Sequence, residues 1–330
     1  MARKIILDVD TGSDDAVAIM AAVLSPDIQL EALCSVDGNK DIDKTTENTL
    51  RVVQLLGADV PVYRGSRGPL VKDLCPDRLD VRMAHVVSCI DEHGNYLQMH
   101  SDYLDIPEAR IHEEEISAAE FYVQYLRKAK EPITIVAVGP LTNVALALML
   151  DPNIVNNIEE IVVMGGGYNM TNHTPTAEFN IWHDPEAAQR VITCGAKVTI
   201  VPLDATHAAY ITKDDCRRFR ALKTVSGTFA AELCEQRIVM HNIGQPLAVP
   251  DAAAVHDALC IAYLIDPTVL KDVRHVHCDI GFRDFSEGQT IIDPRYYPEE
   301  RNCYFAFDGD RVKFADILCD LFARDQNKEE

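Results

Sequence analysis

Short apolar runs alternate with helix-like segments along most of this 330-residue chain, and this alternation is the feature that most restricts its fold. The run from Lys4 to Val9 precedes a stretch, Ser13 to Leu24, that has helical periodicity and acids in its first turn. Further strands are predicted at 28–36, 60–63, 133–138, 158–164, 198–201, 273–280 and 303–307, and helices at 43–56, 118–129, 143–150, 185–193 and 312–323. The alternation predicts an α/β protein with an open, mostly parallel, doubly wound sheet flanked by helices.

Two stretches depart from this alternation. Residues 65–115 contain three prolines and no clear periodicity, which predicts a flexible active-site loop or insertion. Residues 213–264 are mainly helical, and we expect them to lie over the active site. Because no internal repeat or low-complexity linker divides the chain, we expect a single domain over 1–330.

The composition excludes several classes of partner. With 31 Lys+Arg against 52 Asp+Glu, the net charge is −21, so we expect no nucleic acid polymer as a partner. A cleft lined by carboxylates would also repel phosphorylated ligands. No apolar run is long enough to cross a bilayer, so we expect no membrane association. The ten cysteines form no Cys-x-x-Cys pair and no secretory segment is recognisable, which predicts reduced thiols in a cytoplasmic protein.

The segment from Asp8 to Asp15 holds four carboxylates within eight residues. Side chains alternate between the two faces of a strand, which places Asp8 and Asp10 on one face. Ser13 is expected to cap the helix that begins with Asp14 and Asp15. Such carboxylates repel one another unless they share a cation or a proton. Helix capping explains the last three residues but not the strand aspartates, so we predict a metal site. Oxygen ligands with no nearby Cys or His favour Ca²⁺ or Mg²⁺ over zinc.

Two further blocks carry polar residues beyond predicted strands. Met164 is followed by three glycines, which allow the backbone to approach a ligand closely, although phosphate-loop spacing is absent. Residues with donors and acceptors suited to sugar hydroxyls follow: Asn172, Glu178 and Asn180. Turn and capping chemistry accounts for the same three residues. The pair His256-Asp257 places a titratable ring beside a carboxylate, an arrangement that helix starts also produce.

These blocks, taken in order, resemble the inosine–uridine-type nucleoside hydrolases along nearly the whole chain. The matching blocks are Asp8-Val-Asp-Thr-Gly-Ser-Asp-Asp-Ala16, Gly38-Asn39, Val138-Gly-Pro-Leu-Thr-Asn143, Met164-Gly-Gly-Gly167, Ala177-Glu-Phe-Asn180 with Asp184-Pro-Glu-Ala-Ala188, Leu203-Asp-Ala-Thr206 and Ala254-Val-His-Asp257. Thr11 stands where the family commonly has proline. The resemblance implies that a small ribonucleoside is the substrate and that a homodimer or homotetramer is the assembly.

The resemblance also implies a role for each block. Ca²⁺ would be held by Asp10, Asp15, Asp257 and the main-chain carbonyl of Val138, together with waters. Asp10 would take a proton from the metal-bound water, and His256 would protonate the leaving base. The ribose would contact Asp14, Asn39, Met164, Asn172, Glu178 and Asn180. The expected reaction is hydrolysis of the N-glycosidic bond to ribose and free base.

Departures from the family pattern leave the base open. The family's His-Gly segment in the loop after the third strand has its nearest counterpart at His93-Gly94, so we assign His93 to substrate binding. The run 244–251 lacks the aromatic and basic residues expected beside the base. Two other functions remain: a haloacid-dehalogenase-like phosphatase with Asp8 as nucleophile, Asp10 as acid and Mg²⁺, and a nucleoside-binding protein without turnover.

Overall fold

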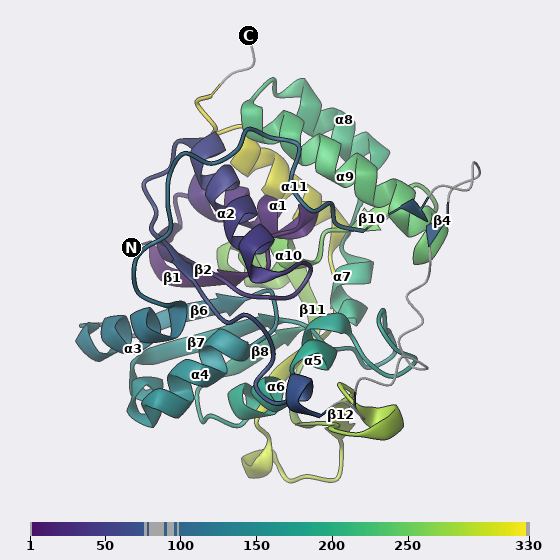
Figure 1. Cartoon of the computed structure of the whole chain (residues 1–330). Coiled ribbons are helices and arrows are strands. Elements are labelled where there is room, and N and C mark those ends of the chain that lie inside the picture. The colour runs from purple at the N-terminus through teal and green to yellow at the C-terminus, as the bar shows by residue number, and fades with distance from the viewer. Residues whose placement is uncertain (1, 76–77, 79–88, 91–95, 98, 328–330) are drawn as a thin grey trace.

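A nine-stranded sheet forms the centre of the computed structural model, which describes residues 2–75, 78, 89–90, 96–97 and 99–327 (Figure 1). The strand order is β12-β11-β13-β8-β7-β6-β1-β2-β3. The bounds are β1 (Arg3–Val9), β2 (Ile28–Ser35), β3 (Val62–Arg64), β6 (Ile133–Ala137), β7 (Ile158–Met164), β8 (Val198–Val201), β11 (Leu270–Ile280), β12 (Thr290–Asp293) and β13 (Cys303–Gly309). Neighbours from β3 to β13 pair in parallel, whereas β11 is antiparallel to both β13 and β12. The predicted open, mostly parallel sheet is confirmed.

The strand order reverses at β1, and this reversal places the site. The chain fills the sheet outward from β1 through β2 to β3, and then returns to fill the other side with β6, β7 and β8. Asp8 of β1 therefore lies between Cys34 of β2 and Ala137 of β6. At such a switch point the connections leave in opposite directions and open a crevice beyond the carboxyl ends of the strands. Asp10 and Val138 follow β1 and β6 directly into this crevice.

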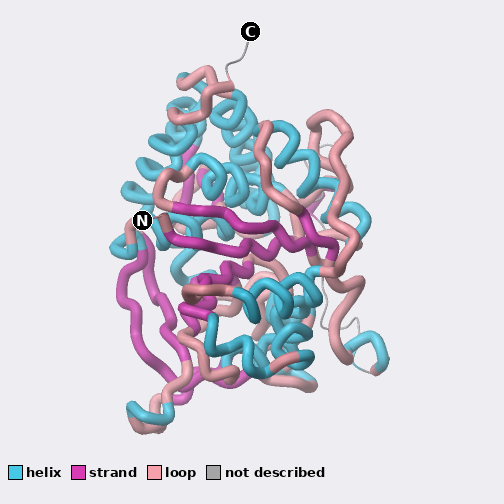
Figure 2. The backbone as a smooth tube through the Cα atoms, turned by 90° about the vertical axis from the view of Figure 1, so that its left-hand side faces the viewer, coloured by secondary structure: helices cyan, strands magenta, loops and turns pink. Residues whose placement is uncertain are grey.

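Helices cover both faces of the sheet (Figure 2). One hydrophobic core contains Leu7 and Val9 of β1, and the helices whose buried residues join it are α1 (Ser13–Leu24), α2 (Ile42–Leu56), α8 (Lys213–Ala221), α9 (Val225–Gly244), α10 (His256–Ile265) and α11 (Arg311–Phe322). The other core contains Ile6 of β1, and α3 (Ala118–Lys128), α4 (Thr142–Leu150) and α6 (Pro185–Ile192) pack into it. Successive side chains of β1 thus point alternately into the two cores, as expected for a strand that is buried on both faces.

Several short elements were not predicted from the sequence. They are α5 (Phe179–His183), α7 (Leu203–Ala208), β9 (Tyr210–Thr212), β10 (Ala252–Ala254) and β12, together with a small pair of strands, β4 (Cys89–Ile90) and β5 (Tyr96–Leu97). β9 and β10 pair with each other in a separate antiparallel ribbon. Elements of two to six residues are too short to show a period of their own. The predicted flexibility of residues 65–115 stays a prediction, since part of that stretch lies outside the described residues.

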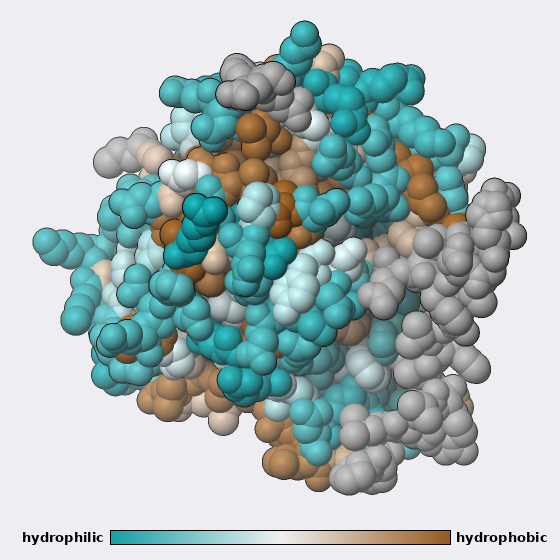
Figure 3. Space-filling model, turned by 45° about the horizontal axis from the view of Figure 1, so that its top comes forward, coloured by the Kyte–Doolittle hydropathy of each residue, from teal (hydrophilic) through white to brown (hydrophobic). Residues whose placement is uncertain are grey.

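The visible surface agrees with the acidic composition. Figure 3 shows a mostly hydrophilic face with smaller hydrophobic areas. Within the part of the chain that the structure describes, no helix combines the length and the apolar composition needed to cross a bilayer.

Candidate functional site

The site is built where two helices begin next to the end of β1. Asp14 and Asp15 lie in the first turn of α1, and His256 and Asp257 are the first two residues of α10. α1 and α10 pack against each other (Figure 1). The start of a helix carries partial positive charge, so both helices favour carboxylates at these positions.

Asp10 is fixed in a narrow cradle between two loops. The Asn39 main-chain N–H donates to Asp10 Oδ2 (2.7 Å), and Asn39 Nδ2 donates to the Asp10 carbonyl and to Asp15 Oδ2 (both 3.2 Å). A Cβ at Gly38 would lie 2.2 Å from Asp10 Oδ2, and one at Gly139 would lie 2.8 Å from Oδ1. Only glycine fits at these two positions, which explains the glycines in the Gly38-Asn39 and Val138-Gly139 blocks.

Three buried carboxylates form a cluster with the spacing of a metal site. One oxygen each from Asp14, Asp15 and Asp257 lies within 4.8 Å of the others. Burial and the charge of Asp14 raise the pKa of Asp15 to about 6. Burial, followed by the neighbouring aspartates, raises the pKa of Asp257 and of Asp10 well above the usual range. Asp10 adjoins the cluster through its main-chain N–H, which donates to Asp15 Oδ1 (3.1 Å). Repulsion among these groups is what a bound cation would relieve.

Asp8 does not belong to this cluster. It is fully buried and accepts hydrogen bonds from the Tyr122 hydroxyl (3.0 Å) and Asn143 Nδ2 (3.1 and 3.3 Å), which come from α3 and α4. Burial raises the pKa of Asp8 to about 7. β1 ends at Val9, so Asp10 lies just beyond the strand, and the prediction that Asp8 and Asp10 share one face stays a prediction. A phosphatase would need Asp8 exposed as a nucleophile, and this structure does not provide that.

The start of α1 also differs from its prediction. Gly12, not Ser13, is the N-cap residue, and the Asp15 carboxylate accepts from the Gly12 N–H (2.9 Å). Ser13 is the first helical residue, and its Oγ accepts from Arg237 Nη1 (2.9 Å). The hydroxyl is turned toward another helix, so it does not cap the first N–H groups of α1, and Asp15 binds the N–H of the N-cap residue instead.

Arg237 of α9 contacts the carboxylate cluster, and it was not identified from the sequence. Its side chain is 2% exposed, and Nη1 lies 2.9 Å from Asp14 Oδ1. Its Nε donates to the Ala254 carbonyl (2.9 Å), which fixes the guanidinium plane. Arg237 gives the cluster a buried positive charge, and Asp14 is its partner.

Three imidazole rings surround the start of α10. His256 Nδ1 lies 2.7 Å from Thr206 Oγ1, and the His256 ring centre is 5.7 Å from that of His207 and 6.0 Å from that of His241. Burial and then Arg237 lower the pKa of His256 well below its usual range, and burial lowers the pKa of His207 to about 4 and of His241 to about 3. Both His207 nitrogens and His241 Nε2 are buried and lack a hydrogen-bond partner among the described residues. Neutral rings with unsatisfied nitrogens suit a polar heterocycle.

His100 is the described histidine of the 65–115 stretch that reaches the site. Its Nδ1 accepts from the Ser13 N–H (3.3 Å) and lies 4.0 Å from Asp14 Oδ1. A Cβ on Gly12 would come within 2.0 Å of this ring, so the contact requires glycine there. His93, the residue proposed from sequence, lies outside the described residues, and its role stays a prediction.

Glu178 combines a capping function with a position in the site. It is the N-cap of α5, where its carboxylate accepts from the N–H groups of Asn180 (2.9 Å) and Ile181 (3.2 Å). The Gly166 N–H of the glycine loop donates to the same carboxylate (2.9 Å). Burial raises the pKa of Glu178 to about 7. The capping interpretation therefore holds, and it leaves a buried carboxyl group with a high pKa beside the glycine loop.

The two asparagines of this block hold strand ends together. Asn180 Nδ2 donates to the carbonyls of Val138 (2.8 Å) and Met164 (3.2 Å), which follow and end β6 and β7 respectively. Asn172 Oδ1 accepts from the Phe179 N–H at the start of α5 (2.9 Å). The structure thus brings the predicted sugar-binding block to the same crevice as the Val138 carbonyl.

Comparison with known proteins identifies the family. The profile described as inosine-uridine preferring nucleoside hydrolase matches residues 5–316. The chain belongs to this family. Pyrimidine-specific ribonucleoside hydrolase RihA of Enterobacter sp. (strain 638) is 37% identical over 335 residues, covering 98% of this chain and 99% of that protein. RihA of Escherichia coli O8 (strain IAI1) is 36% identical over 329 residues, covering 97% and 98%.

Solved structures of nucleoside hydrolases share the fold. The plant nucleoside hydrolase PpNRh1 superposes with a TM-score of 0.84 at 26% identity, covering 98% of this chain and 99% of that one. The purine-preferring ribonucleoside hydrolase from Gardnerella vaginalis gives 0.81 at 28% identity, covering 97% and 98%. The predicted activity, hydrolysis of the N-glycosidic bond of ribonucleosides, is confirmed, and the phosphatase alternative is wrong. The relatives' names include both pyrimidine-specific and purine-preferring enzymes.

Proposed function

We propose that this nucleoside hydrolase works with Ca²⁺ held by Asp10, Asp15, Asp257 and the main-chain carbonyl of Val138. The observation that carries the proposal is the group of buried carboxylates at the starts of α1 and α10, which Arg237 balances with a single positive charge. Each of these four proposed ligands offers an oxygen, and Ca²⁺ accepts six to eight oxygen ligands in irregular geometry. When bound, the cation lowers the pKa of a coordinated water and thereby supplies a nucleophile near neutral pH.

Asp10 is the residue that accepts the proton of the attacking water. Its carboxylate cannot rotate away, because Gly38 and Gly139 enclose it and the Asn39 N–H binds it. Burial raises its pKa, and a carboxylate of higher pKa is a stronger base once it is ionised.

The ribose is bound beside the cation by Asp14, Asn39, Met164, Asn172, Glu178 and Asn180, of which Asp14 and Asn39 adjoin the proposed metal ligands directly. Departure of the base leaves positive charge on the sugar ring, which nearby carboxylates such as Asp14 and Glu178 stabilise. A site built to hydrogen-bond a hydroxyl rejects a ligand that lacks it, because its buried polar groups are then unpaired. The proposal therefore includes a preference for ribonucleosides over 2′-deoxyribonucleosides.

His256 acts on the leaving base. If the Thr206 hydroxyl donates to Nδ1, the neutral His256 ring carries its proton on Nε2. That N–H donates to the base nitrogen as the glycosidic bond breaks. His207 and His241 complete the surroundings of the base with further ring nitrogens.

A reducing-sugar assay over a panel of nucleosides and deoxynucleosides tests this proposal. We expect ribose release from ribonucleosides by the wild type, loss of release in Asp10→Ala and with a Ca²⁺ chelator, and recovery when Ca²⁺ is returned after chelation. Asp59→Ala is a matched control, since Asp59 is an exposed aspartate outside the site. Wild-type rates in Asp10→Ala, or equal turnover of uridine and deoxyuridine, would contradict the assigned roles.

We further propose a cytoplasmic location, a homodimer or homotetramer, and a single domain over 1–330. Nine cysteines among the described residues are free thiols, which fits a reducing compartment. The continuous nine-stranded sheet supports one domain. Light scattering after size exclusion measures the assembly, and a monomer would contradict it.

A further inference from the structure

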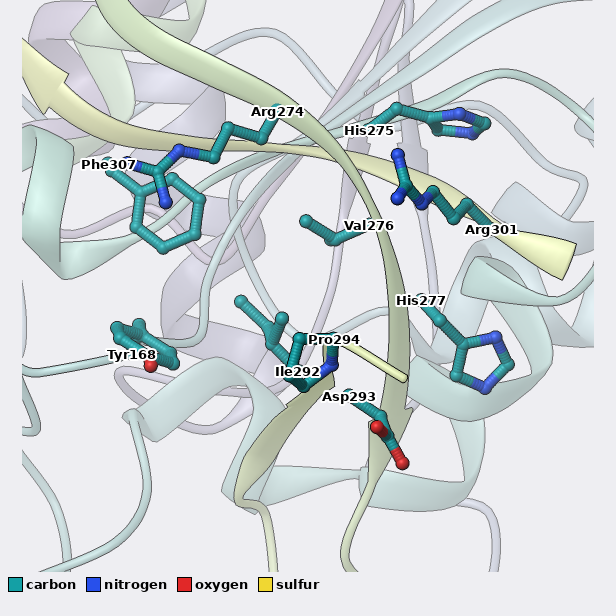
Figure 4. A pocket seen from close by; sticks show the side chains of 10 residues that line it. All are labelled: Tyr168, Arg274, His275, Val276, His277, Ile292, Asp293, Pro294, Arg301 and Phe307. Carbon is teal, nitrogen blue, oxygen red and sulfur yellow. The ribbon is translucent and has the colours of Figure 1, made fainter. Parts of the chain in front are cut away.

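A second cavity, of about 400 Å³, lies at the antiparallel edge of the sheet. β11, β12 and β13 form it together with Tyr168, which follows the glycine loop (Figure 4). The side chains that determine its chemistry are Tyr168, Arg274, His275, His277, Arg301 and Phe307. A volume of this size is within the range of pockets that hold small molecules.

Two arginines and one aspartate line the cavity, and Asp279 beside it is paired with His277 (Oδ2–Nε2 3.1 Å), in a chain whose net charge is −21. Arg274 Nε binds Asp272 Oδ1 (2.7 Å), and Asp293 at the cavity rim is neutralised by Arg295 (Nη2–Oδ2 2.6 Å). Arg301 is half-buried, and its guanidinium has no ion pair or hydrogen bond with any residue that the structure describes. An unpaired guanidinium in an acidic protein is a binding group for an anion.

Flat and apolar surfaces lie beside this charge. The Tyr168 and Phe307 rings meet edge to face with centres 5.5 Å apart, and the Arg274 guanidinium lies 4.5 Å from the centre of the Phe307 ring. Val276 lies between Arg274 and Arg301 in the wall of the cavity (Figure 4). Aromatic side chains and an aliphatic wall bind the faces of a planar ring, whereas a guanidinium binds phosphate.

We propose that this cavity binds a nucleoside monophosphate outside the active site. The phosphate lies on Arg301, and the base lies against Tyr168 and Phe307. The two sites divide ligands by charge, because the carboxylates of the active site repel a phosphate that the cavity attracts. The proposal goes beyond the proposed function and requires no turnover.

The cavity is connected to the active site through the loop that carries Tyr168. The N–H groups of Tyr168 and Asn169 donate to the Asp204 carboxylate (2.7 and 2.9 Å). Asp204 belongs to α7, which also carries Thr206, the partner of His256. A ligand that packs against Tyr168 therefore contacts a loop that is hydrogen-bonded to α7. The same helix carries Thr206, which adjoins the candidate base site.

Isothermal titration calorimetry of the full-length, Ca²⁺-loaded protein with UMP tests the proposal. We expect Arg301→Gln to weaken UMP binding about 10- to 100-fold, the usual loss for a hydrogen bond to a charged group. Arg283→Gln, which removes an exposed arginine from a neighbouring turn, should bind UMP as the wild type does. Arg301→Gln should also retain its melting temperature and its nucleoside hydrolysis, which separates this test from that of the proposed function.

Two comparison ligands define the chemistry. Inorganic phosphate and 2′-deoxyuridine should each bind to this cavity at least about tenfold more weakly than UMP, because each lacks one of the two recognised parts. UMP affinity that is unchanged in Arg301→Gln would overturn the proposal. So would phosphate binding as tight as UMP binding, or complete displacement of UMP by saturating ribose, the reaction product that the active site holds.

Discussion

The crevice beyond β1 and β6 and the antiparallel edge at β11–β13 belong to one sheet but differ in charge. In the crevice, Asp10, Asp14, Asp15 and Asp257 are buried together, and Arg237 offsets only part of their charge. At the edge, Asp272 and Asp293 are paired with arginines and Asp279 with His277, and the Arg301 guanidinium is left over. Under our two proposals, ligand choice depends on which charges are left unpaired at a site and not on the net charge of the chain.

The largest effect that we expect is a difference between Asp8, which lies inside β1, and Asp10, which lies just beyond its end. Asp10→Asn should lower kcat by about 10²- to 10⁴-fold, because it removes the proposed base and puts a side chain of nearly the same size in its place. Asp8→Asn should retain most of kcat and lose stability instead, since its amide group must face the Tyr122 or Asn143 donors. Steady-state kinetics and melting temperatures of both variants check this. Similar losses of kcat in the two would remove the distinction between them.

Arg237 tests whether the crevice needs its positive charge. Arg237→Gln leaves Asp14 buried without its cation, and breaking a buried ion pair of this kind costs about 3–5 kcal/mol. We expect urea unfolding in the presence of chelator to show a loss of that size, and added Ca²⁺ to recover part of it. Arg237→Lys is the matched control and should lose less. If Arg237→Gln unfolds at the wild-type urea concentration, the ion pair contributes nothing to folding.

The pKa of Asp15 gives a pH dependence with a definite sign. Its folded-state pKa is about 6 against 3.8 for the free group, so the folded protein binds this proton more tightly than the unfolded chain does. Without metal, this group's contribution to stability is therefore present at low pH and is lost as the pH rises from about 4 through 6. Ca²⁺ relieves the repulsion, so the gain in melting temperature on adding Ca²⁺ should be larger at pH 8 than at pH 5. Thermal unfolding with CaCl₂ or EDTA at each pH measures it, and an equal gain would contradict a shared cation.

The parts of the site that the sequence predicted are local or lie at strand ends. Asp10 and Asp15 are five residues apart in one strand–turn–helix unit, and Val138 directly follows a strand, so their positions follow from the fold class alone. Asp8 and Asp10 differ in position, because Asp8 lies inside β1 and is bonded to Tyr122 of α3 and Asn143 of α4, whereas Asp10 lies beyond the end of the strand.

The parts that were missed depend on packing between distant elements. Arg237 lies inside α9 and His241 lies in its last turn, and both look like ordinary helical residues until that helix packs against α1. Arg274 and Arg301 line the same cavity only because β11 pairs with β13, where Val276 is opposite Cys303. Basic residues scattered through an acidic sequence read as solvated surface charge, and no periodicity shows which of them lacks a partner.

The smallest effect that we expect concerns the connection between the two regions. A nucleotide held against Tyr168 orders the loop that Asp204 anchors, and a substrate that binds next to an already ordered loop loses less entropy. Saturating UMP should therefore lower the KM for p-nitrophenyl riboside by about fivefold, the low end of ordinary coupling between sites. Arg301→Gln should abolish this effect and keep the KM measured without UMP. A rise in KM that persists in Arg301→Gln would instead mean that UMP competes in the crevice, and the edge would then have no influence on the acidic site.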